Sequence, residues 1–241
     1  MTAPAYSVVL PAHNEEGLLE PTILEIRKGL RDREEPFEIL IVENGSSDAT
    51  GRLALRLAEE HAEIRVLSLP VADYGRAVAT GLLAATGDLI VHFDVDYYDL
   101  GFLDEAATLV RSGRAGIVLA SKRAPGARDR RPLVRRILTA GFATAMRLLL
   151  EMPVSDSHGM KVLSRRPCQE IAGRCTMTGP LFDVELVLRA ARAGVAIAEL
   201  PAEVSELRPP RTPVTRRAIE SAAGLIRLRM LLRRESETAG G

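Results

Sequence analysis

The chain has 241 residues, 46% of them hydrophobic, which is enough to bury the core of one large domain or two small ones. Its 32 basic residues balance its 32 acidic ones, which excludes the overall basic charge typical of a nucleic-acid-binding protein. The chain has two cysteines, Cys168 and Cys175, which form no CxxC motif and have no histidine pair nearby, so we expect no zinc centre. A disulfide between them is possible but has no further support, and a protein of a reducing cytoplasm fits this cysteine content best.

The first half of the chain alternates short β-rich runs with longer segments of period near 3.6. The segment 49–60 is a predicted helix that Ser47 or Asp48 would cap. Runs such as ILIV and LIVHF are apolar on both faces, which is typical of parallel strands covered by helices on each side. The predicted strands of this half lie at 6–12, 37–42, 64–69 and 88–93. We therefore predict an α/β fold with a single, mostly parallel, Rossmann-like sheet.

The second half is less regular, and we interpret it as part of the same domain. An arginine-rich loop separates its first strand from its first helix, and the glycine- and proline-rich segments 173–180 and 207–213 are predicted loops within one fold. The final residues, ESETAGG, are polar and small, and we expect them to be frayed. The predicted elements are strands at 115–121, 159–164 and 195–204 and helices at about 132–150 and 181–194.

Three polar clusters follow predicted strands of the first half. PAHNEE follows the first strand, ENGSSD the second and DVDYYD the fourth. Because ligands of parallel α/β sheets bind at the carboxyl ends of the strands, this coincidence predicts a binding site there.

The acids of the third cluster need a partner, because like charges a few ångströms apart repel unless a cation or a proton neutralises them. Asp94 and Asp96 lie two residues apart, so both can face one side and bind Mg²⁺ or Mn²⁺ together with phosphate oxygens and water. The alternative is a solvated turn with helix-capping acids, in which Asp99 caps a helix that starts near Gly101.

The motifs PAHNEE, ENGSSDAT, YGRAVATGLLAATGDLIVHFDVDYYD, SKR, SDSHGMKVLSRR and FDVELVLRAARAG occur in this order. Together they resemble the family 2 glycosyltransferases of GT-A fold, of the polyprenyl or dolichyl phosphate mannose synthase type. The resemblance covers about residues 6–207. It implies that Asp94-Val95-Asp96 binds the divalent cation, Mg²⁺ or Mn²⁺, that holds the diphosphate of a nucleotide-sugar donor.

The resemblance also implies roles for individual residues. Asp94 and Asp96 are the expected metal ligands, and Asp96, Asp156 and Arg123 the expected catalytic residues. The expected acceptor and phosphate contacts are Lys122, Arg123, Arg135, Thr139 and His158. The expected donor contacts are Pro11, Ala12, Asn14, Glu15, Glu43, Asn44, Gly45, Asp73, Arg76, Asp94 and Val95.

A basic stretch supports the acceptor assignment independently. Seven lysines and arginines fall within the fifteen residues 122–136, which predicts a bound anion, although a loop with ordinary salt bridges is the alternative. Guanidinium groups bind phosphate oxygens in pairs, so Arg123 and Arg135 would grip an acceptor phosphate or the leaving diphosphate.

The chain departs from the family's pattern at several positions. Glu43-Asn44 stands where the family usually has two aspartates, which leaves the donor's identity open, and Tyr98 stands where a glutamine is frequent. His13 replaces a frequent tyrosine and is expected to be a packed or surface histidine. His92, inside a strand, is expected to be buried with its hydrogen bonds satisfied.

Two arginine-bordered segments, at about 132–150 and 214–234, have the pattern of amphipathic helices. Such helices can rest on anionic bilayers, although a core helix with a charged outer face has the same pattern. The N-terminal segment has no basic region, and no apolar run approaches the roughly 18 residues of a bilayer-crossing helix. We therefore expect a cytoplasmic protein that neither spans a membrane nor is secreted, with association to the inner face of the cell membrane as a hypothesis. The apolar positions are Val134, Leu138, Phe142, Ala145, Leu148, Leu149 and Leu150 in the first segment and Ile219, Ala223, Ile226 and Met230 in the second.

The leading functional hypothesis is an inverting, metal-dependent hexosyltransferase that moves mannose or glucose from a donor of the GDP-mannose or UDP-glucose type to a polyprenyl phosphate. The same chemistry on a soluble acceptor, such as a natural product or a phosphorylated metabolite, and a non-catalytic nucleotide-sugar-binding module are the alternatives. An alcohol acceptor would need a base, for which Asp156, Asp183 and Glu185 are the available carboxylates. We expect one domain, 1–241, with a donor half at 6–99, an acceptor half at 100–207 and an amphipathic helix with a frayed tail at 208–241.

Overall fold

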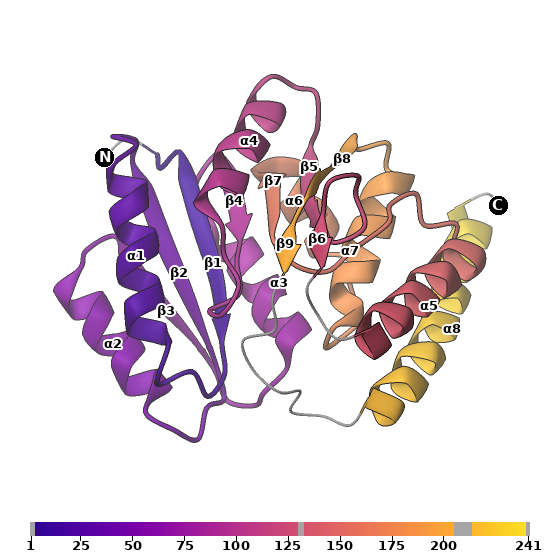
Figure 1. Ribbon diagram of the computed structural model, residues 1–241, viewed down its shortest axis with the longest axis horizontal. Helices are drawn as coiled ribbons and strands as arrows, with labels where there is room; N and C mark the ends of the chain where they lie inside the picture. Colours follow the sequence, from indigo (N-terminus) through magenta and orange to yellow (C-terminus); the bar gives the residue numbers. More distant parts are fainter. Residues whose placement is uncertain (1–2, 130–132, 205–213, 240–241) are drawn as a thin grey trace.

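The computed structural model describes residues 3–129, 133–204 and 214–239, without the side chains at 129, 134–135, 138–139, 204, 214–222 and 236–239. Its strands are β1 (Tyr6–Ala12), β2 (Phe37–Asn44), β3 (Ile64–Leu69), β4 (Leu89–His92), β5 (Ile117–Ser121), β6 (Arg128–Asp129), β7 (Lys161–Ser164), β8 (Ile197–Pro201) and β9 (Glu203–Val204). Seven of them form one sheet in the order β3-β2-β1-β4-β7-β5-β8, and β6 pairs with β9 (Figure 1). The predicted single, mostly parallel sheet is confirmed.

Helices cover both faces of this sheet (Figure 1). They are α1 (Leu19–Arg31), α2 (Thr50–Glu60), α3 (Tyr74–Ala84), α4 (Leu100–Arg111), α5 (Leu133–Leu150), α6 (Arg165–Ala172), α7 (Leu181–Arg192) and α8 (Val214–Ala239). The first core packs α1, α2 and α4 on one face, where Val8 and Leu10 point. The second packs α3, α6, α7, α5 and α8 on the other face, to which Val9 contributes, because successive side chains of a strand point to opposite faces.

Within the seven-stranded sheet, β7 is the strand that runs antiparallel to its neighbours, β4 and β5. This insertion was not predicted, and it has a consequence for the site. The register pairs His92 of β4 with Lys161 of β7. The same alternation turns both side chains toward the face that α3 and α7 cover, where Ile90 and Leu163 also lie.

The strand β1 carries a proline near its end, which a central strand normally excludes because proline cannot donate a ladder hydrogen bond. Pro11 is accommodated since the pairing with β4 ends at Val9, two residues earlier, while the pairing with β2 continues. The ladder between β1 and β4 therefore ends before Pro11.

Helix starts agree in part with the sequence. Asp99 caps α4 as predicted, its carboxylate accepting from the backbone N–H groups of Gly101 and Phe102 at 2.8 and 3.1 Å. The residue before α2 is Ala49, not the predicted Ser47 or Asp48, although Asp48 accepts from the backbone N–H of Thr50 at 2.9 Å. The helix α6 was missed, because its eight residues are too few for a clear period.

The helix α8 continues to Ala239, into the segment 235–241 that the sequence analysis expects to be frayed. At the start of this segment, Arg189 of α7 donates to both carboxylate oxygens of Glu235 at 2.8 and 2.9 Å. Across the part of the chain that the structure describes, no helix has both the length and the apolar character needed to cross a bilayer.

For α5, the described residues of the predicted stripe fit the alternative of a core helix better than a lipid-facing one, except for the exposed Leu148. Phe142, Ala145 and Leu149 pack partly against the second core, where α5 meets α8. The exposed apolar residues of α5 are Leu133, Ile137 and Leu148, at 66%, 61% and 74% exposure. On α8, Ile226 and Met230 are exposed as predicted, while Leu225, Leu228 and Leu232 are buried. The side chains of Val134, Leu138 and Ile219 lie outside the described residues.

Candidate functional site

A cleft of about 290 Å³ lies at the carboxyl ends of β1, β2, β3 and β4. Its position agrees with the rule for parallel α/β sheets and with the predicted strand-end clusters. The lining residues that the sequence predicted are Pro11, Glu15, Asn44, Asp73, Asp94, Val95 and Asp96. Those that it missed as site residues are His13, Ala72 and Tyr74.

The loop after β1 is held to the loop after β2 by side chains that the sequence had assigned to the donor. Asn14, at a φ of 54°, accepts from the backbone N–H of Ser47 at 2.8 Å, and the backbone N–H of Glu15 donates to Thr50 at 2.7 Å. His13 approaches the backbone carbonyl of Asn44 with Nδ1 at 2.8 Å. His13 is therefore a cleft residue rather than a histidine packed elsewhere, and Asn14 shapes the loop from outside the lining.

The Glu43-Asn44 pair divides between two tasks. Asn44 lines the cleft and accepts from the backbone N–H of Asp73 at 2.8 Å. Glu43 turns into its own loop and accepts from the backbone N–H of Ser46 at 2.6 Å, so it is not a lining residue. Gly45 has a φ of +62°, and a Cβ there would lie 2.8 Å from the backbone nitrogen of Ala72, so only glycine fits.

Asp73 begins α3 and joins it to the predicted loop 173–180. Its Oδ1 accepts from the backbone N–H groups of Arg76 at 3.1 Å and Gly179 at 2.9 Å. A Cβ on Gly75 would lie 2.7 Å from the carbonyl oxygen of Gly179, so the start of α3 is in close contact with the residues before α7. The side chain of Arg76 is exposed and does not line the cleft, and Ala12 is buried in β1.

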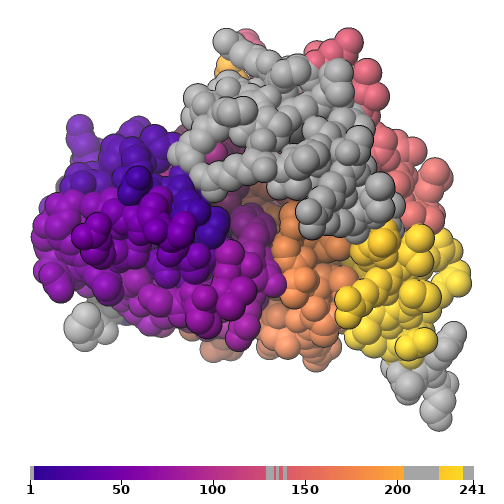
Figure 2. All heavy atoms as spheres, turned by 90° about the horizontal axis from the view of Figure 1, so that it is seen from below, coloured from indigo at the N-terminus to yellow at the C-terminus, as the bar shows by residue number. Residues whose placement is uncertain are grey.

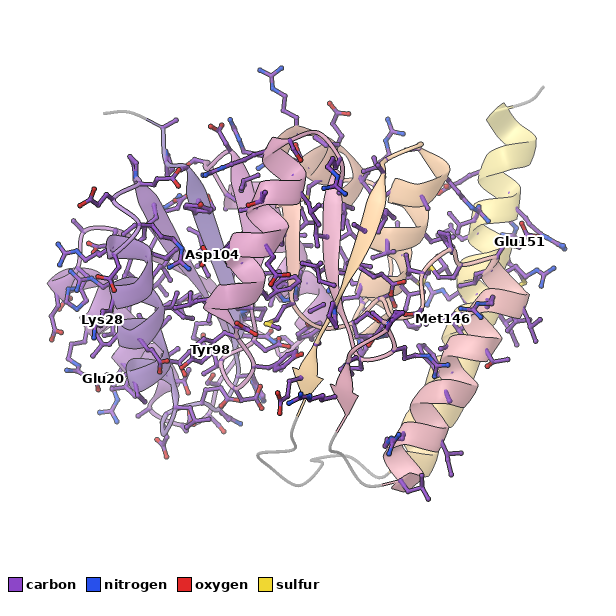
Figure 3. The ribbon with its side chains drawn as sticks, turned by 45° about the horizontal axis from the view of Figure 1, so that its top comes forward. Glu20, Lys28, Tyr98, Asp104, Met146 and Glu151 are labelled. Carbon is purple, nitrogen blue, oxygen red and sulfur yellow. The ribbon has the colours of Figure 1, made fainter. Side chains whose placement is uncertain are left out.

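The two predicted metal ligands stand at the edge of the cleft after β4. A backbone bridge between Asp94 and Tyr97 closes a turn, with Asp94 half-buried and Asp96 exposed. Burial raises the pKa of Asp94 to about 6, and the negative charges of Asp183 and Asp96 add to the rise while Lys161 opposes it. Tyr98 points away to α1, where its hydroxyl donates to Glu25 at 2.6 Å (Figure 3).

A buried polar group lies behind Asp94. The hydroxyl of Tyr74 is 3.4 Å from His92 Nε2, 3.4 Å from Asp94 Oδ1 and 3.5 Å from Asp183 Oδ2. Lys161 Nζ lies 3.0 Å from Asp183 Oδ1, and both side chains are 1% exposed. The sequence had considered Asp183 as a base, but its burial behind Asp94 removes it from direct contact with a substrate in the cleft.

Charges within this group fix its protonation. Burial and the positive charge of Lys161 lower the pKa of His92 to about 3, so its imidazole is neutral near pH 7. Burial and the charges of Asp183 and Asp94 raise the pKa of Tyr74 well above its usual range, so the hydroxyl keeps its proton. Burial opposes ionisation of Asp183, but Lys161 together with His92 and His158 outweighs it, so the pKa of Asp183 is lowered. His92 is buried as predicted, but its Nδ1 has no hydrogen-bond partner in the described parts of the chain.

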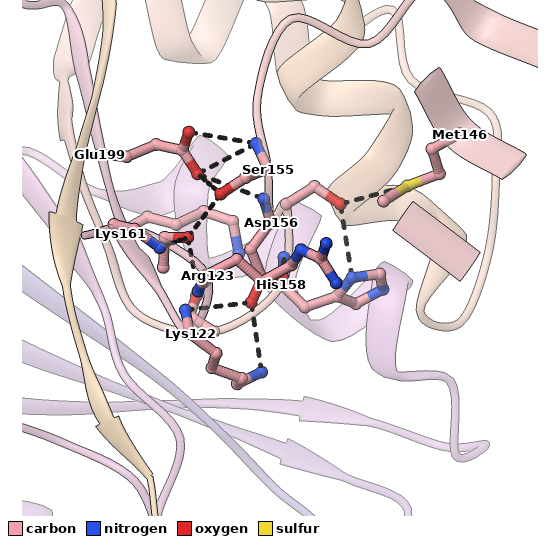
Figure 4. A network of polar contacts seen from close by, with 12 residues as sticks. Lys122, Arg123, Met146, Ser155, Asp156, His158, Lys161 and Glu199 are labelled. Carbon is pink, nitrogen blue, oxygen red and sulfur yellow. Dashed lines mark hydrogen bonds and ion pairs between the residues drawn. The ribbon is translucent and has the colours of Figure 1, made fainter. Parts of the chain in front are cut away.

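Several residues that the sequence analysis assigns to the acceptor form a second polar network (Figure 4). Asp156 is 4% exposed, and its carboxylate accepts from the backbone N–H of His158 at 3.1 Å and lies 3.6 Å from Lys122 Nζ. Glu199 of β8 accepts from the hydroxyl of Ser155 at 2.6 Å and from the backbone N–H of Asp156 at 3.2 Å. These contacts make Asp156 a buried part of the loop, and Glu199, which the sequence had not singled out, is its support.

The remaining acceptor candidates differ in what can be said of them. Arg123 is exposed, and its backbone N–H donates to Ser121 at 3.1 Å. Burial lowers the pKa of His158, whose ring contacts that of Phe142 on α5 at 5.8 Å between centroids. The side chains of Arg135 and Thr139 lie outside the described residues.

The carboxylate oxygens of Asp94 and Asp96 are ligands that suit a hard divalent cation. Among the residues that the structure describes, no three histidine, cysteine or carboxylate side chains are grouped to hold a metal by themselves. Mg²⁺ needs only one or two protein carboxylates when water and substrate phosphates complete its shell. Asp94 and Asp96 supply that number, and a cation would stabilise the ionised form of Asp94, whose pKa is raised first by burial and then by the charges of Asp183 and Asp96.

Comparison of the fold identifies its class. Glucosyl-3-phosphoglycerate synthase from Mycobacterium tuberculosis, crystallised with Mn²⁺, uridine diphosphate and glucosyl-3-phosphoglycerate, has a TM-score of 0.67 to this chain at 23% identity. The similarity covers 94% of this chain and 80% of that one. The fold is therefore the GT-A fold of glycosyltransferases, as the sequence motifs implied.

Sequence comparison identifies the family. Residues 7–172 match the glycosyl transferase family 2 domain. The chain is 32% identical over 213 residues to dolichyl-phosphate beta-glucosyltransferase ALG5A of Trichomonas vaginalis, covering 83% of this chain and 66% of that protein. It is 32% identical over 202 residues to glycosyltransferase AglD of Haloferax volcanii, covering 82% of this chain but 32% of AglD. The chain belongs to glycosyl transferase family 2.

Proposed function

We propose that this chain is an inverting, metal-dependent hexosyltransferase that uses a nucleoside diphosphate sugar and a polyprenyl phosphate at the cytoplasmic membrane face. The observation that carries the proposal is the cleft, which joins four strand ends and ends at the two carboxylates Asp94 and Asp96. The similarity to a dolichyl-phosphate beta-glucosyltransferase supports the lipid phosphate acceptor and favours glucose over mannose. Residues 6–99 would bind the donor and residues 100–207 the acceptor.

In this proposal the residues of the cleft orient the donor. Asp94 and Asp96 would hold Mg²⁺ or Mn²⁺, which when bound stabilises the negative charge of the departing nucleoside diphosphate. Asn44, Asp73 and His13 line the inner cleft and offer amide, carboxylate and imidazole groups to the nucleoside. Attack by the acceptor on the opposite face of the sugar would invert the anomeric centre.

The acceptor-side residues fit a phosphate better than an alcohol. A phosphate monoester has a second pKa of about 6, so it arrives ionised and needs no general base. The carboxylate of Asp156 is buried and already engaged with Lys122 and His158, which argues against its use as a base. Lys122 and the exposed Arg123 would instead supply positive charge to the acceptor phosphate, with Arg135 as a further candidate.

A donor and acceptor screen tests the proposal. Wild-type protein is incubated with UDP-glucose or GDP-mannose, Mg²⁺ or Mn²⁺, and either a polyprenyl phosphate in detergent or 3-phosphoglycerate. We expect transfer to the polyprenyl phosphate that depends on the cation and stops with a chelator. Transfer only to the soluble phosphate would favour the alternative acceptor class, and donor binding without transfer to either would favour a non-catalytic binding module.

The helix α8 supports the membrane location. α5 and α8 pack together, and α8 lies at the surface beside the region of α7 (Figure 2). The apolar residues Ile226 and Met230 share the exposed side of α8 with arginines, which attract anionic lipid. The four arginines of this segment with described side chains are Arg227, Arg229, Arg233 and Arg234.

We expect the protein to sediment with anionic vesicles at low salt and to be released at high salt. Each arginine near the surface contributes about 1 kcal/mol, and salt shortens the range of the attraction. Changing all four arginines to glutamine should weaken binding strongly, whereas neutral vesicles should bind less of the wild-type protein. Changing the exposed residues Arg52 of α2 and Arg114 after α4, which lie outside α5 and α8, to glutamine is the charge control. Equal sedimentation of wild type and the quadruple variant would contradict the membrane location.

A further inference from the structure

The hydroxyl of Tyr74 has more potential acceptors around it than it can serve. His92 Nε2, Asp94 Oδ1 and Asp183 Oδ2 all lie within 3.5 Å of it, on three different elements of the fold. A phenol carries one proton, so it donates one strong hydrogen bond and can accept others. The role of Tyr74 therefore depends on which of these three neighbours accepts the hydrogen bond from its hydroxyl.

The histidine is the first to be assigned. Nδ1 of His92 has no hydrogen-bond partner in the described residues, whereas Nε2 faces the hydroxyl of Tyr74 and lies 3.9 Å from Asp94 Oδ1. An imidazole with one proton carries it on the nitrogen that has an acceptor, which here is Nε2. His92 then donates to the oxygen of Tyr74, and the proton of Tyr74 is left for a carboxylate.

The two carboxylates differ in their need for that proton. Asp183 is paired with Lys161 at 3.0 Å, and Lys161 is held in turn by the carbonyl oxygen of Gly159 at 2.8 Å. Asp94 forms no ion pair with a lysine or arginine of the described residues, and His92 and Tyr74 are the groups that approach its Oδ1. A buried carboxylate that lacks a counter-charge gains more from a hydrogen bond than one that is already paired with a lysine. The proton of Tyr74 is therefore donated to Asp94.

The geometry points to Tyr74 as a positioning residue for Asp94: its hydroxyl, oriented by His92 and braced by the Lys161–Asp183 pair, holds Oδ1 of Asp94 inward. The other oxygen, Oδ2, makes none of these contacts, and Asp94 is a residue of the cleft lining, so Oδ2 is the oxygen left for a cation. This inference rests on the proposed function, in which Asp94 is a cation ligand. Supporting residues of this kind fix the orientation of a ligand, and their loss typically weakens metal binding 10- to 100-fold.

The sequence around these residues agrees with such a role. Tyr74 is the first residue of α3, where the close contact of Gly75 with Gly179 fixes the helix against the segment that leads to Asp183. Lys161 is a fully buried lysine that precedes Val162 and Leu163 in β7, and its register partner is His92. Tyr74 and His92 thus approach Oδ1 of Asp94, and Asp183 and Lys161 lie behind them in the same buried group.

The test is the affinity for Mn²⁺, measured by the loss of the electron paramagnetic resonance signal of free Mn²⁺ in the presence of saturating UDP, with GDP in a second arm. We expect Tyr74→Phe to bind Mn²⁺ 10- to 100-fold more weakly than wild type. Tyr74→Gln, which restores a side-chain donor, should recover part of the affinity. Where sugar transfer is measured, kcat should fall while KM for the acceptor stays within twofold.

The matched control is Tyr6→Phe. This variant also loses a hydroxyl that donates to a carboxylate, that of Glu35 at 3.1 Å. Tyr6 is the first residue of β1, whereas the cleft lies at the other end of this strand. Its Mn²⁺ affinity should equal that of wild type, and the urea midpoints of both phenylalanine variants report any general loss of stability.

The possible failures can be told apart. Unchanged Mn²⁺ affinity in Tyr74→Phe, or an equal loss in Tyr6→Phe, overturns the positioning role while the proposed function stands. If wild-type protein binds no Mn²⁺ with either nucleotide, the proposed metal site falls, and the role of Tyr74 falls with it.

Discussion

Replacing Asp96 with alanine is expected to reduce sugar transfer by at least about a hundredfold while the protein stays folded. The carboxylate is exposed at the edge of the cleft, so its removal leaves no cavity and no buried partner behind. Losing one group that stabilises charge in the transition state costs on the order of 10²–10³ in kcat. Initial rates with the donor that the screen identifies, at several Mn²⁺ concentrations, measure the effect.

Asp104→Asn is the matched control for the loss of an exposed carboxylate. Asp104 lies on α4 and binds Arg33 at 2.8 Å, outside the cleft (Figure 3). This variant should transfer sugar at the wild-type rate, since an exposed ion pair contributes only about 0–1 kcal/mol to stability. Wild-type turnover that resists a chelator, or an Asp96→Ala variant with normal activity, would rule out a metal at this site.

Breaking the Lys161–Asp183 pair is expected to produce the largest loss of stability. Both side chains are 1% exposed, so Lys161→Met leaves the carboxylate of Asp183 buried without its counter-charge. Removing one partner of a buried ion pair typically lowers the free energy of unfolding by roughly 3–5 kcal/mol. Urea denaturation followed by circular dichroism measures it.

The double variant Lys161→Met with Asp183→Leu separates this explanation from simple loss of packing. Replacing both charges by apolar groups is often nearly neutral, so the double variant should be more stable than Lys161→Met alone. Glu20→Gln serves as the surface control, because the pair of Glu20 with Arg56 is 37% and 44% exposed and should contribute less than about 1 kcal/mol. A double variant less stable than the single one would contradict the uncompensated-charge explanation.

The pH dependence of this pair has a definite sign. The fold lowers the pKa of Asp183 below its ordinary value of 3.8. The carboxylate therefore contributes stability that is present above that value and is lost as the pH falls through the lowered pKa. The difference in stability between wild type and Lys161→Met should accordingly be full at pH 7 and shrink in acid.

The candidate site was predictable from sequence wherever its residues follow a strand. Pro11, Asn44, Asp94 and Asp96 stand at or just after the ends of apolar runs, and parallel strands bring such ends to one edge of a sheet. Asp73 came from the family resemblance and is likewise a lining residue. In each case the position along the chain and the rule for parallel sheets were sufficient.

Side-chain directions were less predictable, because they depend on neighbours. Glu43 and Asn44 are adjacent, yet one turns into its loop and the other lines the cleft. For α5, periodicity identified an apolar stripe but not whether it faces lipid or the protein, which the packing of α5 on α8 within the second core decides. The contact of Glu235 with Arg189 likewise depends on how α7 packs against α8.

By itself, the sequence determined the α/β class, the strand ends, the acid pair and the family, because these depend on local patterns of two to about twelve residues. The group behind Asp94 was decided only by the tertiary structure. Tyr74, His92, Lys161 and Asp183 meet because β7 enters the sheet antiparallel beside β4 and α7 packs closely on the start of α3. A period shows which face of an element a residue occupies, but only the register and packing of distant segments decide what lies opposite.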